Sequence, residues 1–171
     1  MELFYIPTKY AKAPFLNFSS VKTKLLDYFD NYLPSSTSSN ITKTDWSDSL
    51  DFNREWTKFI LPLLEFNLLN LSNFLGYKNI TINQVWFQQY TQNSFHSWHT
   101  HSSHYTGAFY VELPNGTPKT QLKVDNNILN IDAKEGEIVI FPSFISHRSP
   151  KNTSPYRKTI ISFNIDLVTQ E

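Results

Sequence analysis

The hydrophobic pattern of the chain changes its period near Gly76, and this change constrains the fold more than any other feature. Before Gly76, apolar residues recur every three to four positions, which predicts helices over about 19–33 and 53–75. After Gly76, short alternating or continuous apolar runs predict strands at about 83–90, 105–113, 120–124, 128–132, 137–141, 145–148 and 158–167. We therefore expect a mainly β protein whose N-terminal helices pack outside a barrel or sandwich.

Size and composition exclude several classes of protein. A chain of 171 residues predicts a single domain over 1–171, with 1–78 as helical support and 79–168 as the β core. With 4 glycines and no glycine-rich loop, the chain has neither a Rossmann nor a P-loop phosphate site. The absence of cysteine removes disulfides, thiol nucleophiles and zinc–thiolate sites.

Charge and hydropathy indicate where the protein acts. The 15 basic and 15 acidic residues cancel, which argues against broad electrostatic binding to nucleic acid. No apolar run approaches the roughly 18 residues that span a bilayer, and the first residues do not resemble a signal peptide. We expect a cytoplasmic protein that binds no membrane, and the high aromatic content is compatible with an oligomer.

All five histidines lie in the β half of the chain, and four of them fall within nine residues: His96, His99, His101 and His104. A solvated histidine-rich turn, or a few core histidines with satisfied hydrogen bonds, would also account for such a cluster. The spacing of His99 and His101 favours a metal site, because residues i and i+2 of a strand share a face. Neutral imidazole suits iron, zinc, copper or nickel.

His147 is the fifth histidine, and it lies just after the buried-strand pattern Gly136-Glu137-Ile138-Val139-Ile140-Phe141-Pro142. Across a small barrel, a histidine beside that strand can face the first pair and complete a three-histidine site. Ten residues further on, Arg157 and Thr159 share one face of the last predicted strand. A guanidinium and a hydroxyl near a metal suit an anionic cosubstrate.

These segments together, from about Val85 to Leu167, resemble the 2-oxoglutarate/Fe(II)-dependent dioxygenase superfamily. The resembling pieces are Trp98-His99-Thr100-His101, then Thr106-Gly107-Ala108-Phe109-Tyr110-Val111, then the 136–143 strand with His147, then Arg157-Lys158-Thr159 and Ser162-Phe163-Asn164. The chain is similar to the group of small 2OG-Fe(II) oxygenases with an HxH ligand pair, which is common in bacteria and marine phages. The resemblance implies a double-stranded β-helix, or jelly roll, flanked by α-helices.

The resemblance also implies roles for individual residues. His99, His101 and His147 would be the iron(II) ligands, with His101 where most of the superfamily has a carboxylate. Arg157, assisted by Thr159, would bind the distal carboxylate of 2-oxoglutarate. Tyr110 stands where prolyl-hydroxylase-like members place a tyrosine on the same carboxylate, and Tyr90 matches a tyrosine that lines the pocket. No catalytic residue beyond the metal ligands is implied.

Three other residues match no ligand position. His96 and His104 are expected beside the ligands, at the pocket mouth or in exposed turns. Trp98 has the opposite strand parity from His99, so it should pack outside the barrel.

The resemblance implies a hydroxylase-type oxygenase that uses iron(II), 2-oxoglutarate and O2. Its substrate would be an unknown small molecule or protein side chain, in a bacterial cell or a phage-infected host.

Two alternatives to this activity remain open. The first is a cupin-type enzyme with a three-histidine metal site, although no glutamate follows His101 at the usual spacing and Arg157 has no role there. The second is a non-catalytic jelly-roll module that binds or builds a phage structure, against which the intact set of histidines argues.

Overall fold

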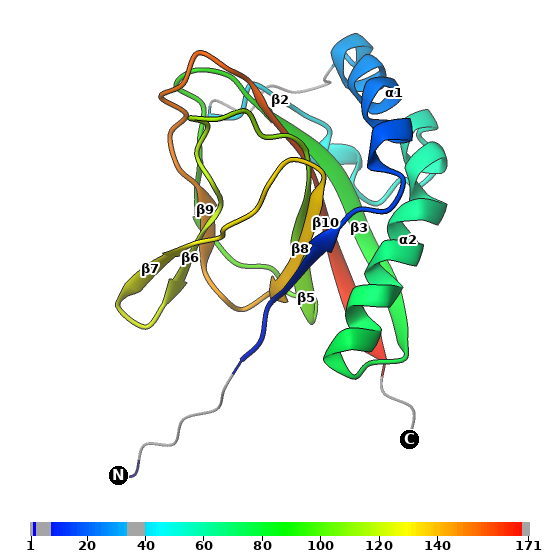
Figure 1. The fold of residues 1–171 in the computed structure, drawn as a ribbon, viewed down its shortest axis with the longest axis vertical. Helices are drawn as coiled ribbons and strands as arrows, with labels where there is room; N and C mark the ends of the chain where they lie inside the picture. Colours follow the sequence, from blue (N-terminus) through cyan, green and yellow to red (C-terminus); the bar gives the residue numbers. More distant parts are fainter. Residues whose placement is uncertain (1, 3–7, 34–39, 169–171) are drawn as a thin grey trace.

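The computed structural model describes residues 2, 8–33 and 40–168, and these form two antiparallel sheets with two α-helices on one side (Figure 1). In strand order, the larger sheet contains β1 (Ala11–Pro14), β8 (Glu137–Pro142), β5 (Tyr105–Glu112), β10 (Lys158–Val168), β3 (Asn79–Tyr90) and β2 (Lys43–Thr44). The smaller sheet contains β4 (His96–His99), β9 (His147–Ser149), β6 (Gln121–Val124) and β7 (Asn127–Asn130). The mainly β fold with N-terminal helices is confirmed.

The helices α1 (Phe18–Asn31) and α2 (Glu55–Leu75) cover the outer face of the large sheet (Figure 1). Both agree with the predicted ranges, and Pro62 lies inside α2 without ending it. Gly76 ends α2 with a positive φ of 97°, a conformation that glycine adopts without steric cost. The buried stripes of both helices pack on the outward residues of β3, β5, β8 and β10 and form the main core.

A second, smaller core lies between the two sheets. It contains Tyr90, Tyr110, Leu122, Phe141 and Ile160 among its buried members. Gly107 on β5 has the opposite orientation, because a Cβ at this position would overlap the carbonyl oxygen of Val139 and the ring of Phe163 in the main core. A larger residue there would therefore disturb the main core and not the space between the sheets.

Asp45 ties the segment before α2 to the large sheet. Its carboxylate is fully buried and accepts hydrogen bonds from the Phe87 amide, the Trp56 indole and the Arg54 guanidinium. Arg54 also donates to the carbonyl of Val85. A buried carboxylate is tolerated only with such partners, so this cluster fixes the start of α2 against β3.

Three strands lie outside the predicted ranges. The expected helical support over 1–78 also supplies β1 and β2, which are the two edge strands of the large sheet. β4 carries two of the clustered histidines and has a register shift between His96 and His99. Such short strands are defined by their partners rather than by their own sequence pattern.

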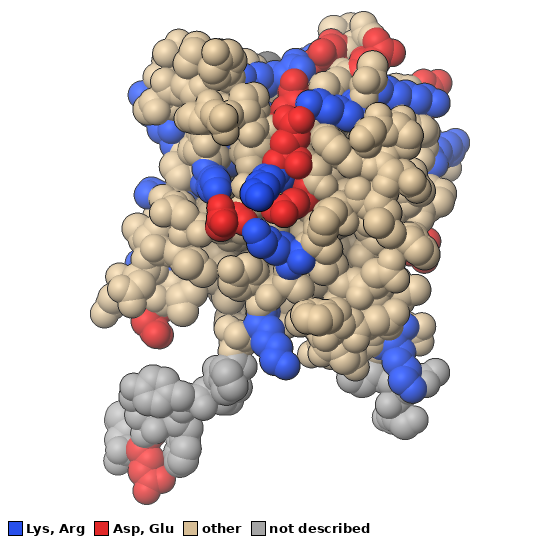
Figure 2. Space-filling view, in the orientation of Figure 1, with Lys and Arg blue, Asp and Glu red and all other residues tan. Residues whose placement is uncertain are grey.

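The described helices include none that is long and apolar enough to cross a membrane. Near the middle of the face shown in Figure 2, basic and acidic side chains lie next to one another. That part of the surface therefore has mixed charge.

Candidate metal centre

His99, His101 and His147 form the only group of three or more potential metal ligands found among the described residues. One ligand nitrogen from each ring lies within 4.8 Å of the other two. His147 is buried, whereas His99 and His101 are partly accessible. Three imidazoles that converge in this way can hold one divalent ion of the iron, zinc, copper or nickel type and leave further positions open.

The backbone brings these three residues together through the small sheet. His147 lies in β9 between β4 and β6, directly opposite His99 on one side and Leu122 on the other. His101 lies two residues beyond β4, and its amide donates to the carbonyl of Ser143 in the turn that precedes β9. The two histidines of the HxH pair therefore converge through a loop, and not along one strand face as their spacing predicted.

Two of the three rings are oriented by backbone carbonyls. Nδ1 of His99 lies 2.8 Å from the carbonyl oxygen of Ser97, and Nδ1 of His147 lies 3.0 Å from that of Ile145. A carbonyl only accepts, so each Nδ1 carries the hydrogen and each Nε2 keeps a free lone pair. Metal-binding histidines are held in this tautomer by such outer partners.

Burial keeps these imidazoles neutral. It lowers the pKa of His147 to about 3, with a further contribution from the nearby His99, and it lowers the pKa of His101 to about 4 for the same two reasons. Burial also lowers the pKa of His99, partly offset by its bond to Ser97. Neutral imidazole is the form that binds a metal, so the triad is ready to bind at neutral pH.

A pocket opens beside the triad between the two sheets. Its walls combine the three histidines with buried residues of β3, β5 and β10, among them Trp86, Gln88, Tyr90, Ala108, Ile160 and Ser162. His96 also lines it, with its ring stacked on that of His99 at 3.9 Å between centroids. Nδ1 of His96 lies 3.4 Å from the amide nitrogen of Gln88. His96 is therefore a pocket residue beside the ligands.

His104 and Trp98 lie away from this pocket. Nδ1 of His104 accepts a hydrogen bond from the amide of Leu167, and the ring is mostly exposed. Trp98 packs against Arg148, whose guanidinium carbon lies 4.5 Å from the indole centroid. His104 therefore contacts β10 of the large sheet, and Trp98 contacts β9 of the small sheet.

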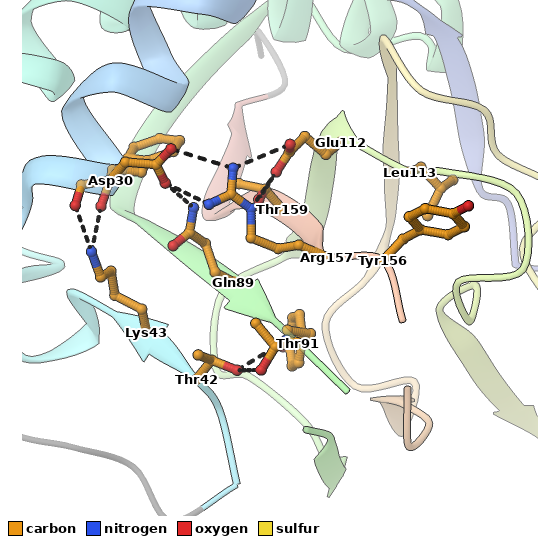
Figure 3. A network of polar contacts seen from close by, with 12 residues as sticks. Asp30, Thr42, Lys43, Gln89, Thr91, Glu112, Leu113, Tyr156, Arg157 and Thr159 are labelled. Carbon is orange, nitrogen blue, oxygen red and sulfur yellow. Dashed lines mark hydrogen bonds and ion pairs between the residues drawn. The ribbon is translucent and has the colours of Figure 1, made fainter. Parts of the chain in front are cut away.

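Arg157 and Thr159 also face away from the pocket, into the polar network of Figure 3. The Arg157 guanidinium forms ion pairs with Asp30 of α1 and with Glu112 of β5, at 2.5 Å and 2.8 Å. The Thr159 hydroxyl donates to the same Glu112 carboxylate. The structure therefore joins Arg157 and Thr159 to each other but does not bring them to the histidines.

Lys158, the next residue, has its side chain on the inner side of the large sheet. It is completely buried, and its amine donates to the Ser149 hydroxyl and to the Pro118 carbonyl, both at 3.0 Å. The amine lies 5.3 Å from the centroid of the Tyr90 ring and 6.0 Å from that of Tyr110. Ser149 and Tyr90 both line the pocket. Burial lowers the pKa of Lys158 to about 7.

Both tyrosines that the sequence indicated surround this lysine. Tyr110 is buried and donates to Thr120, a pocket residue, at 2.9 Å. Burial raises the pKa of both phenols, so each stays a neutral donor.

The sequence did contain a signal for Lys158, namely the alternation of residues along β10. One face of this strand carries the apolar residues Ile161, Phe163 and Ile165. Lys158 lies on the opposite face, together with Ile160, Ser162 and Asn164.

Comparison with known proteins agrees with this architecture. No protein-family model matches the chain, and no curated protein matches it. Solved structures do match. A prolyl-4-hydroxylase of Pseudomonas putida has a TM-score of 0.63 at 14% identity, over 92% of each chain. A 2OG-Fe(II) oxygenase family oxidoreductase of Burkholderia pseudomallei has a TM-score of 0.68 at 11% identity, over 92% of this chain and 84% of that one.

A viral collagen prolyl hydroxylase of Paramecium Bursaria Chlorella virus-1 also matches, with a TM-score of 0.65 at 15% identity over 98% of each chain. The fold is therefore that of the 2-oxoglutarate/iron(II) oxygenases, which confirms the predicted jelly-roll core. The three-histidine cluster fits the HxH…H arrangement that the resemblance implied.

Proposed function

We propose that the protein is an iron(II)- and 2-oxoglutarate-dependent oxygenase that hydroxylates a small molecule or a protein side chain. The observation that carries the proposal is the combination of three converging neutral imidazoles with a buried lysine behind the same pocket. The shared fold supports it, because the matching solved structures include prolyl hydroxylases and an oxidoreductase of the 2OG-Fe(II) oxygenase family.

The triad fits iron(II) by the chemistry of its donors. His99, His101 and His147 would hold the ion and leave positions for the cosubstrates. Bound iron(II) supplies the activation of O2, with one oxygen atom going to the succinate formed as 2-oxoglutarate loses CO2 and the other to the substrate. Phe141, whose ring lies 4.9 Å from that of His147, forms an apolar part of the wall beside the triad, while Gln88, Thr120 and Ser162 provide polar groups in the same pocket.

We further propose that Lys158, rather than Arg157, binds the distal carboxylate of 2-oxoglutarate. Its ammonium has no carboxylate partner among the described residues, and a buried cation of this kind is stabilised by an anion that enters beside it. Thr120, Tyr90 and Tyr110 would complete the carboxylate site as hydroxyl donors. Arg157 already has two carboxylate partners, so it offers no free charge to a cosubstrate.

The test is anaerobic addition of iron(II) and 2-oxoglutarate to the purified protein, followed by the visible charge-transfer absorption of the ternary complex. The expected result is an absorption band that disappears in His147→Ala and persists in the matched control His104→Ala. Metal binding without the band would favour the cupin-type alternative, and absence of metal binding would refute the proposal.

A further inference from the structure

His101 is the one member of the triad whose Nδ1 faces a side chain instead of a backbone carbonyl. The Nδ1 atoms of His99 and His147 each lie beside a carbonyl oxygen, as described above. Nδ1 of His101 lies 3.5 Å from the amide nitrogen of Asn164. The Asn164 side chain therefore occupies, for His101, the place that a carbonyl holds for the other two rings.

Burial and hydrogen bonds hold the Asn164 side chain in place. It is almost fully buried in β10, between β3 and β5. Its amide nitrogen donates to Oε1 of Gln84 at 2.7 Å, and Nε2 of Gln84 donates to the buried Ser49 hydroxyl at 3.2 Å. Hydrogen bonds thus connect three polar side chains, Ser49, Gln84 and Asn164, from the segment before α2 to the metal centre.

We propose that Asn164 is a positioning residue that accepts the Nδ1 hydrogen of His101 and so directs Nε2 of His101 to the metal; this rests on the proposed function. A histidine binds a metal through the ring nitrogen that carries no hydrogen, and an acceptor at the other nitrogen fixes that choice. Because Asn164 flanks Nδ1, the nitrogen left for the metal is Nε2, as in His99 and His147.

The proposal requires the amide oxygen of Asn164 to face His101 in the metal-bound protein. A half-turn of an amide exchanges its oxygen and nitrogen with almost no change of shape. Oδ1 of Asn164 has no hydrogen-bond partner among the described residues; in this turn it gains partners, and the amide nitrogen takes the buried position that has none. A matching half-turn of Gln84 lets its nitrogen donate to Asn164 and its oxygen accept from Ser49. The hydrogen bonds between Asn164 and Gln84 and between Gln84 and Ser49 are then kept with their directions reversed.

The test compares the affinity for Co(II), measured by calorimetric titration, of the parent protein and of its variants Asn164→Leu and Asn164→Asp. We expect Asn164→Leu to bind roughly 10- to 100-fold more weakly, the usual effect of losing an outer partner of a ligand. Asn164→Asp should bind at least as tightly as the parent, because a carboxylate is an acceptor only. Asn67→Leu is the matched control, since Asn67 is equally buried but bonds to Leu16 and Leu63.

Two outcomes would overturn the proposal: a folded Asn164→Leu with parental affinity, or an Asn164→Asp as weak as Asn164→Leu. Should Asn164→Leu not fold, nitrogen NMR of the zinc-loaded parent and of Asn164→Asp decides the matter, since a hydrogen on Nδ1 of His101 is expected and a hydrogen on Nε2 contradicts it. A parent protein that binds no metal would refute the proposed function itself, so the two failures are distinguishable.

Discussion

Arg157 and Lys158 are consecutive residues whose side chains lie on opposite sides of the large sheet. Arg157 joins Asp30 and Glu112 on the side of α1, whereas Lys158 lies buried between the sheets with its amine on Ser149. Only one of the two can therefore meet a ligand in the pocket. Arg157 thus connects α1 to β5 on the outer face, whereas the Lys158 amine, bonded to neutral groups alone among the described residues, is the one that we propose binds an anion.

The first prediction concerns cosubstrate affinity. Lys158→Met should weaken 2-oxoglutarate binding by about 100-fold or more, because removing one partner of a buried ion pair costs roughly 3–5 kcal/mol. Arg157→Met should change it by less than about threefold while lowering the melting temperature, since its partners are structural. Titration of the anaerobic iron protein with 2-oxoglutarate measures the dissociation constant of each variant. If Arg157→Met weakened binding as much as Lys158→Met, Arg157, and not Lys158 alone, would be part of the cosubstrate site.

The second prediction follows from the lowered pKa of Lys158. Below about pH 7 the free protein already carries the charge that a carboxylate needs, whereas above pH 7 the lysine must take up a proton on binding. The dissociation constant for 2-oxoglutarate should therefore rise with pH above 7, by up to about tenfold per pH unit. Lys158→Arg, which stays charged, should show no such rise in a titration series from pH 6 to 9.

The third prediction concerns the acid stability of the metal-free protein. The pKa values of His96, His101 and His147 lie at about 4, 4 and 3, below the ordinary value of 6.5. The unfolded chain then binds more protons than the folded one below about pH 6.5, so stability falls as the pH falls from there toward 4. Melting temperatures should show this loss. His147→Ala should lessen the slope, and a slope unchanged in that variant would contradict the assignment.

The fourth prediction concerns the buried carboxylate of Asp45. Asp45→Ala should lower the free energy of unfolding by about 3–5 kcal/mol, because it leaves the half-buried Arg54 charge and the buried Trp56 indole without their shared acceptor. Urea denaturation measures this loss. The exposed Asp132, paired with Lys119 on the surface, is the control, and Asp132→Ala should have little effect. Equal effects of the two substitutions would refute the role given to Asp45.

The fifth prediction concerns the glycine of β5. Gly107→Ala should prevent stable folding, because the new methyl group would overlap the Val139 carbonyl and the Phe163 ring. Gly76→Ala, where nothing lies within 4 Å, should cost only about 1 kcal/mol from its positive φ. Circular dichroism with urea titration distinguishes the two, and a fully stable Gly107→Ala would show that β5 and β8 can separate at this point.

Much of the architecture was predictable from local pattern. The two helices and the long strands follow from apolar periodicity, which depends on neighbours in the chain. The short strands β1, β2 and β4 were not predictable, because each is held by hydrogen bonds to a distant partner and has too few residues to show a period.

The sequence by itself determined that helices precede strands, and it identified the three histidines that meet. Each of these histidines lies beside a predicted buried strand, which restricts how the strands can pair. Only the tertiary structure decided which of the two consecutive basic residues, Arg157 or Lys158, lies buried behind the pocket. Alternation along a strand allows either the odd-numbered or the even-numbered side chains to face the space between the sheets. The pairing of β10 with β3 and β5, with an irregularity between Thr159 and Ile160, turns Lys158 toward that space and buries it. The same pairing places Asn164 beside His101, a contact between residues 63 apart that no local pattern encodes.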